Sequence, residues 1–204
     1  MRETDLAFKA PYFSKEDLRG RAEAFLAKHH STRVMPVPIE LIVEEMGIDI
    51  VPTPGLQLVC DVDAYTTWDL QWICVEEFVY LNRPARYRFS LAHEVGHIEL
   101  HAAIFKEHRF HTADEWKAFA TSMDDDQYSY LEFHANEFAG HLLVPRQELL
   151  PETEACKLRV SEVLDISKTD PDAFRAFVAE CIAQRFEVSP QVALRRMERE
   201  AIKT

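Results

Sequence analysis

The chain has 204 residues, of which 47% are hydrophobic, enough to bury one substantial core or one core with a small appended module. Its formal net charge of -12 disfavours broad electrostatic binding of nucleic acid but leaves open a local basic patch or a basic protein partner. No stretch approaches the ~20 apolar residues of a membrane helix, and the charged start does not resemble a signal peptide. The four cysteines form no Cys-x-x-Cys pair. We therefore expect a cytoplasmic protein with reduced thiols and no membrane partner.

The first quarter of the chain predicts two helices followed by a small sheet. Ser14 and Asp17 form a capping-box pattern, after which apolar residues recur at helical spacing. A second helix is expected over residues 38–46, with Gly47 ending it. Short segments rich in β-branched or aromatic residues then predict a largely antiparallel sheet. These segments are residues 48–51, 56–62, 72–75 and 78–81.

The remainder is predicted to be helical. One helix is expected from Pro84 to about His101, and another after a second capping box that begins at Thr112. An apolar stripe predicts a third over residues 128–144, which Pro145 ends. Two further helices begin at Asp-Pro and Ser-Pro pairs, residues 170–171 and 189–190. Helices, a small sheet and further helices, in that order, predict an α+β fold.

The helix after the sheet contains the sequence His93-Glu94-Val95-Gly96-His97. Histidines at i and i+4 lie about one turn apart on one face, so both imidazoles can reach one metal ion. Glu94 projects about 100° away from His93, off that face but near enough to reach a water beside the metal. A Lewis acid and a base at one place are what amide hydrolysis requires. Glycine between the two histidines indicates that another element packs closely there.

The third metal ligand does not follow from this motif. Catalytic zinc takes three protein ligands and keeps one position open, but Ala103 stands where the longer form of the motif has a third histidine. His101 lies ~12 Å along a straight helix from His93, so we expect it to pack behind the ligands. Glu132 and Asn136 share a face at i and i+4, so Glu132 can turn toward the metal while Asn136 steadies a ligand. The pattern alone favours a solvated glutamate on a helix flank.

Two segments resemble the ImmA/IrrE family of metallopeptidases. Residues 88–101 are RFSLAHEVGHIELH, where the family typically has R-F-T-L-A-H-E-L-G-H-x-x-L-H. Residues 132–145 are EFHANEFAGHLLVP, where the family typically has E-x-E-A-N-x-F-A-x-x-L-L-M-P. The motifs occur in the family's order, and the resemblance covers the chain from about Val34 to Pro145. One departure is His134, where a second glutamate is common; we expect it to affect the rim of the site more than the ligands.

The resemblance implies a small zincin-like domain in which His93, His97 and Glu132 hold one Zn²⁺ and Glu94 is the general base. Manganese or iron can occupy the same ligands. Members of the family cleave a repressor protein of the helix-turn-helix type and so release genes of mobile elements, phage defence or DNA-damage responses. Several other side chains near Glu132 are candidates to support a ligand or to stabilise the oxyanion. They are Asn136, Tyr128, Tyr130, His134 and His101.

The C-terminal part raises a second possibility. We expect a peptidase domain over residues 1–150 and a helical extension over residues 151–204. Residues 182–196 have the helix, turn and helix outline of a DNA-binding motif, and Arg195, Arg196 and Arg199 add basic character. A helical hairpin packed on the peptidase core has the same pattern, and the acidic chain favours that role. The alternative function is a DNA- or partner-binding regulator whose metal site is structural or silent.

Overall fold

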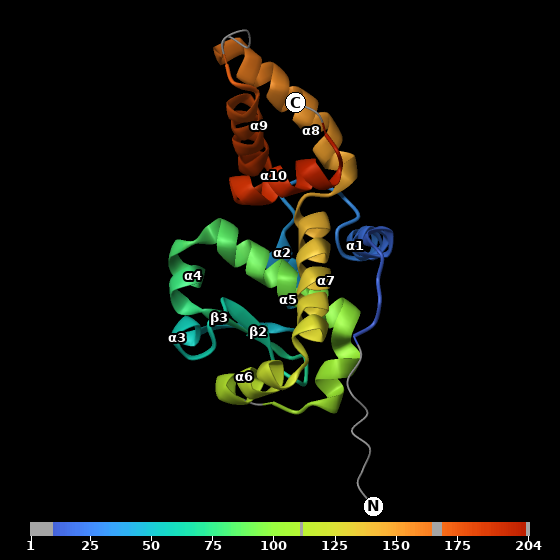
Figure 1. Ribbon diagram of the computed structural model, residues 1–204, viewed down its shortest axis with the longest axis vertical. Helices are drawn as coiled ribbons and strands as arrows, with labels where there is room; N and C mark the ends of the chain where they lie inside the picture. The colour runs from blue at the N-terminus through green and yellow to red at the C-terminus, as the bar shows by residue number, and fades with distance from the viewer. Residues whose placement is uncertain (1–9, 111, 165–168, 203–204) are drawn as a thin grey trace, which may run out of the picture.

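A computed structural model describes residues 10–110, 112–164 and 169–202, so the charged N-terminus lies outside the described residues. Helices dominate, and a three-stranded sheet lies to one side of two crossing central helices (Figure 1). The α+β prediction is therefore confirmed. The helices are α1 (Lys15–His29), α2 (Ile39–Glu45), α3 (Leu56–Cys60), α4 (Glu77–Asn82), α5 (Pro84–Glu107), α6 (Ala113–Ser122), α7 (Asp125–Leu143), α8 (Arg146–Val163), α9 (Pro171–Phe186) and α10 (Pro190–Arg199). The strands are β1 (Asp49–Thr53), β2 (Ala64–Thr66) and β3 (Trp72–Glu76).

The helix starts follow the predicted caps. Ser14 and Asp17 form the complete capping box of α1, and the Thr112 side chain accepts a hydrogen bond from the backbone N–H of Glu115. Asp170 and Ser189 cap α9 and α10 in the same way, each followed by proline in the first turn. These side chains satisfy N–H groups that have no partner within the helix, which is why a local pattern locates a helix start.

The sheet is mixed, with strand order β1-β3-β2. β2 is antiparallel to β3, but β1 runs parallel to β3, so the largely antiparallel sheet of the prediction is wrong for this pair. Two predicted strands are also helices: residues 56–60 form α3 and residues 77–82 form α4. Short apolar runs do not distinguish a strand from one or two buried helical turns. In α3 the pair Leu56 and Cys60, at i and i+4, is buried on one face.

The two central helices, α5 and α7, approach closely at Gly96. A Cβ atom at this position would lie 3.1 Å from the Cα atom and 3.1 Å from the carbonyl oxygen of Ala135. Real Cβ atoms rarely come this close to backbone, and backbone yields less readily than the end of a side chain. The prediction that another element packs against this turn is confirmed, and the contact brings the histidine helix against the helix that carries Glu132.

We expect Gly96→Ala to lower the free energy of unfolding by about 1–3 kcal/mol, because the added methyl group forces α5 and α7 apart. Gly20→Ala is the matched control: this glycine lies inside α1 with nothing within 4 Å of an added Cβ. There alanine should stabilise by roughly 0.5–1 kcal/mol through its higher helix propensity. Urea denaturation of both variants measures the difference, and equal stabilisation by both would contradict the close contact.

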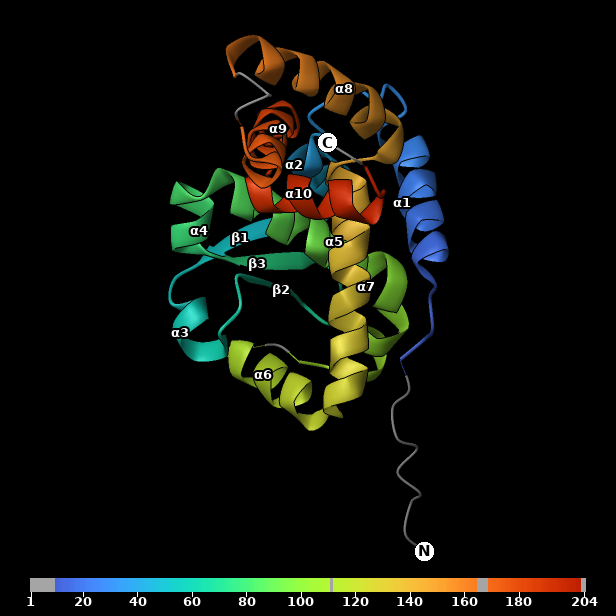
Figure 2. The ribbon, with the colours of Figure 1, turned by 45° about the horizontal axis from the view of Figure 1, so that its top comes forward.

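The last three helices pack on the same core as the central pair. Residues from Leu18 in α1 to Met197 in α10 form one buried cluster. Figure 2 shows α10 crossing α5 and α7, where the Nε atom of Arg196 donates to the carbonyl oxygen of Val144 at the end of α7. The division into domains at residue 150, a position within α8, stays a prediction. No helix in the described ranges is long and apolar enough to cross a membrane.

Candidate active site

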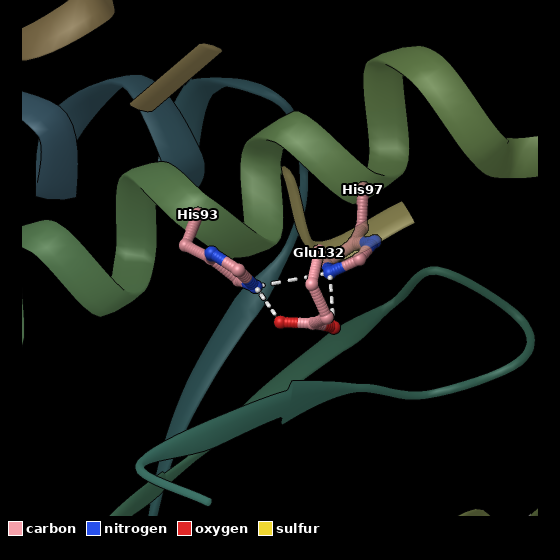
Figure 3. A group of neighbouring side chains, drawn as sticks. All are labelled: His93, His97 and Glu132. Atoms are coloured by element: carbon pink, nitrogen blue, oxygen red, sulfur yellow. Dashed lines mark hydrogen bonds and ion pairs between the residues drawn. The ribbon is translucent and has the colours of Figure 1, made fainter. Parts of the chain in front are cut away.

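Three side chains from the central helices converge on one point. His93 and His97 lie one turn apart on α5 with their Nε2 atoms 3.0 Å apart. The carboxylate of Glu132, from α7, faces both: Oε2 is 3.3 Å from His93 Nε2, and Oε1 is 3.3 Å from His97 Nε2 (Figure 3). One ligand atom from each residue lies within 4.8 Å of the others. Two imidazole nitrogens and a carboxylate oxygen make a donor set that fits a divalent ion such as zinc.

The electrostatics of the cluster favour a charged carboxylate. Burial raises the pKa of Glu132, but the imidazoles of His93 and His97 outweigh that effect and hold the pKa of this carboxyl well below its usual range. Burial likewise lowers the pKa of His93, and hydrogen bonding and attraction to Glu132 more than reverse it, so the net shift is upward. Glu132 therefore presents a negative oxygen to the space between the two imidazoles, which suits a cation.

Glu94 faces the same cavity from the next position on α5. It is 5% exposed, and the Oγ1 atom of Thr66 donates a hydrogen bond of 2.8 Å to its Oε2 atom. Thr66 lies on β2, a strand that the sequence analysis missed, and no motif marked it. The hydrogen bond fixes one carboxylate oxygen and leaves Oε1 to act on a bound molecule.

Asn136 and His101 lie beside His93 and His97, and both also line the cavity. The Asn136 side chain donates to the carbonyl oxygen of Glu132 at 2.7 Å, and its closeness to His93 helps to raise the pKa of that histidine. His101 Nδ1 lies 3.1 Å from His97 Nδ1 and is buried. For His97, Nδ1 thus faces His101 while Nε2 faces Glu132.

His134 extends this row of histidines into the core. Its Nδ1 atom lies 3.4 Å from His101 Nε2, its ring packs edge-on against Phe13, and it is 1% exposed. Burial, then the neighbouring His97, lowers the pKa of His101 to about 2, so His101 is neutral and can accept a hydrogen bond from His97 through Nδ1 while donating one to His134 through Nε2. His134 therefore lies beside His101 in the interior and is not among the residues that line the cavity, contrary to the expectation that it affects the rim of the site.

The tyrosines near Glu132 divide between the cavity and the surface. Tyr128 lines the cavity, which has a volume of about 350 Å³, and its hydroxyl lies close enough to Glu132 for that carboxylate to affect its pKa. Burial, then the charge of Glu132, raises the pKa of Tyr128 well above its usual value, so its hydroxyl stays protonated and can donate. Tyr130 is 51% exposed and is not among the cavity-lining residues. Of the side chains proposed as oxyanion stabilisers, the structure brings Tyr128 into the cavity and leaves Tyr130 and His134 outside it.

Comparison with known proteins agrees with this chemistry. Residues 43–198, most of the chain, match the family model described as the IrrE N-terminal-like domain, a peptidase domain. No curated protein matches the chain. The matched region contains both motifs, the three converging donor residues and Glu94. The chain therefore belongs to the IrrE N-terminal-like family of metal-dependent peptidases.

Proposed function

We propose that this protein is a zinc endopeptidase that cleaves a helix-turn-helix transcriptional repressor and so derepresses stress, phage-defence or mobile-element genes. The observation that carries the proposal is the convergence of His93, His97 and Glu132 on one point of a cavity that Glu94 also lines. In the cavity a substrate carbonyl, a cation and a base can meet, which is the requirement for hydrolysis of a peptide bond.

His93, His97 and Glu132 would hold the metal ion. Zinc is the default for two histidines and one carboxylate, and manganese or iron can occupy the same donors. When bound, such an ion supplies Lewis-acid chemistry, which polarises the scissile carbonyl and makes water a better nucleophile. Asn136 and His101 hold the ring orientations that this arrangement needs, since each contacts one of the two histidines.

Glu94 moves the proton. Its Oε2 atom is engaged by Thr66, so Oε1 would take the proton from the attacking water and pass it to the leaving amine. Tyr128 would donate a hydrogen bond to the oxygen of the carbonyl under attack, since it lines the same cavity and stays protonated. Thr66 thus orients the base, and Tyr128 takes the role that was open among several residues in the sequence.

The substrate would bind as an extended, flexible segment. Residues 61–64, which lead into the edge strand β2, border the cavity, and an extended peptide can add beside such a strand. A repressor is supported by the resemblance of residues 88–101 and 132–145 to ImmA/IrrE peptidases, whose members cut such proteins. The net charge of -12 also favours encounter with a basic DNA-binding protein.

The direct test is to mix the purified protein, loaded with Zn²⁺, with the helix-turn-helix repressor encoded nearest to its gene. We expect a single cleavage, visible by electrophoresis and located by mass spectrometry of the fragments. A chelator should prevent the cleavage, and added Zn²⁺ should restore it. If the repressor remains intact while an unrelated unfolded protein is cut, the protein is a peptidase but the repressor is not its substrate.

The position of Arg196 does not support the DNA-binding alternative. Arg196 is 3% exposed, donates to the carbonyl oxygen of Val144 and pairs with Glu200, so it faces the protein interior. Burial lowers the pKa of Arg196, and the partly buried Glu200 counteracts that shift. A recognition helix instead presents its basic side chains to the phosphates. Arg195 and Arg199 are exposed on α10, but Arg199 pairs with Glu137, and two arginines on an acidic protein give little affinity for DNA.

We expect Arg196→Ala to destabilise the fold by about 2–3 kcal/mol, near the lower end of the range for breaking a buried ion pair because Arg146 still pairs with Glu200. Arg195→Ala, one position along the same helix, should change stability by no more than about 0.5 kcal/mol. Guanidinium denaturation of both variants measures this contrast. A stable Arg196→Ala variant that has lost salt-dependent binding to a DNA duplex would instead favour the regulator.

A further inference from the structure

The helix α6 presents an apolar stripe to the active-site cavity. Trp116, Phe119, Ala120 and Met123 follow one another at i, i+3, i+4 and i+7, and all four line the cavity. None of residues 113–122 is buried. All four are half-buried: Trp116 and Phe119 pack against the smaller core cluster, and the stripe still leaves apolar surface on the cavity that a ligand can cover.

The residues that line the cavity therefore form two chemically different groups, which we call its polar end and its apolar end. One holds the donor residues and Glu94. The other combines the α6 stripe with Ile104 and Phe105 from α5 and Leu131 from α7. The Phe105 ring lies edge-on to the His97 ring with centroids 6.2 Å apart, so the apolar end begins beside a metal-facing histidine. A side chain bound at the apolar end would therefore lie next to the peptide bond held at His97.

The apolar end is supported from behind. The Trp116 ring lies 6.0 Å from the Tyr65 ring of β2, and the Phe119 ring stacks on Phe110 at 5.4 Å. The outer side of α6 is joined to α3, where Lys117 Nζ donates to the carbonyl oxygen of Val59 at 2.6 Å. Both ribbon views place α6 beside the β2 edge of the sheet (Figures 1 and 2). These contacts hold the stripe in its orientation toward the cavity.

We infer that the apolar end is a specificity subsite that takes one bulky apolar side chain, of the size of leucine, methionine or phenylalanine, from the substrate residue next to the scissile bond. The inference rests on the proposed peptidase function and deepens it. The acidic and basic residues that line the cavity belong to other elements, so the α6 wall offers no partner for a charged side chain. A buried charge without a partner is costly, whereas a bulky apolar side chain gains by leaving water.

Binding of small amides tests the subsite without any catalysis. N-acetyl-leucinamide and N-acetyl-phenylalaninamide should shift the Trp116 indole resonance of the Zn²⁺-loaded protein in a saturable way. N-acetyl-alaninamide should need roughly 10–100-fold higher concentration, because it lacks the apolar side chain. Equal binding of all three amides, or no shift at Trp116, would overturn the inference whether or not the protein is a peptidase.

A matched pair of variants locates the subsite. Ala120→Asp places a carboxylate within the apolar stripe, whereas Ala118→Asp places the same group on the exposed side of the same helix. The first should weaken binding of N-acetyl-leucinamide at least ~10-fold, and the second should leave it unchanged. If Ala120→Asp fails to fold, the comparison of amides on the unchanged protein still decides.

Cleavage of a synthetic library of randomised decapeptides connects the subsite to the reaction. We expect leucine, methionine or phenylalanine at one fixed position beside the cut, enriched about 10–100-fold over aspartate, and we expect Ala120→Asp to remove this preference. Cleavage without an apolar preference would overturn the subsite and leave the peptidase function standing. Saturable amide binding with no cleavage of any peptide would support the subsite and count against the proposed function.

Discussion

Replacing Glu94 with glutamine should lower the rate of peptide-bond cleavage by about 10²–10⁴-fold, the usual contribution of a general base. Glutamine keeps the size of the side chain and can still accept the hydrogen bond from Thr66, which is 2.8 Å long in the unchanged protein. It cannot take a proton from water at neutral pH. Because Glu94 is not among the three converging donor residues, the fold and the metal content should stay the same.

Three measurements on this variant separate the enzyme from the regulator. Cleavage of the repressor, followed by electrophoresis, gives the rate; mass spectrometry of metals gives the Zn²⁺ content; and co-purification gives repressor binding. We expect the variant to retain the uncut repressor as a stable complex. A variant that cleaves as fast as the unchanged protein would exclude Glu94 as the base, and loss of metal would make it a ligand instead.

Replacing Glu132 with alanine should empty the metal site. The carboxylate faces both histidines at 3.3 Å and is the contribution of α7 to the donor set, so its loss leaves two donors on one helix. Two imidazoles hold zinc far less tightly than three ligands do. Loss of a residue that only hydrogen-bonds to a ligand lowers the affinity for the metal ~10–100-fold, and we expect the loss of Glu132 to lower it further. His93→Ala and His97→Ala should have the same effect.

Glu137 provides the matched control on the same helix. Its carboxylate pairs with Arg199 of α10 at 2.8 Å, on a side of α7 away from the donor set. Glu137→Ala should therefore keep about one ion per chain, measured by mass spectrometry after gel filtration. The ion should also raise the Tm of the control and leave that of Glu132→Ala unchanged, since only a protein that binds the ion is stabilised by it. The reverse pattern would refute the ligand assignment.

The elements that the sequence predicted with the wrong type are the shortest ones, although α5 also extends beyond its predicted end at His101 to Glu107. Residues 56–60 and 77–82 carry apolar residues in runs too short to show a period. Both segments are helices that pack against strand β3 of the sheet. The parallel pairing of β1 with β3 was also missed, because strand order depends on contacts between distant segments. Helix starts were placed well, since a cap acts within its own four residues, as in Ser14 with Asp17.

The sequence by itself determined what depends on neighbours along one helix. The period of α5 determines the relative positions of His93, Glu94 and His97. Glycine at position 96 indicated that another helix packs closely there, and this helix is α7. Glu132 followed from a family resemblance, because no local rule pairs residues on separate helices. Only the tertiary structure decided that Thr66 holds Glu94, that Tyr128 enters the cavity, that Arg196 faces the interior and that the α6 stripe lines the cavity. Each of these facts is a contact between segments distant in the chain, and such contacts are set by how the whole core packs rather than by local periodicity.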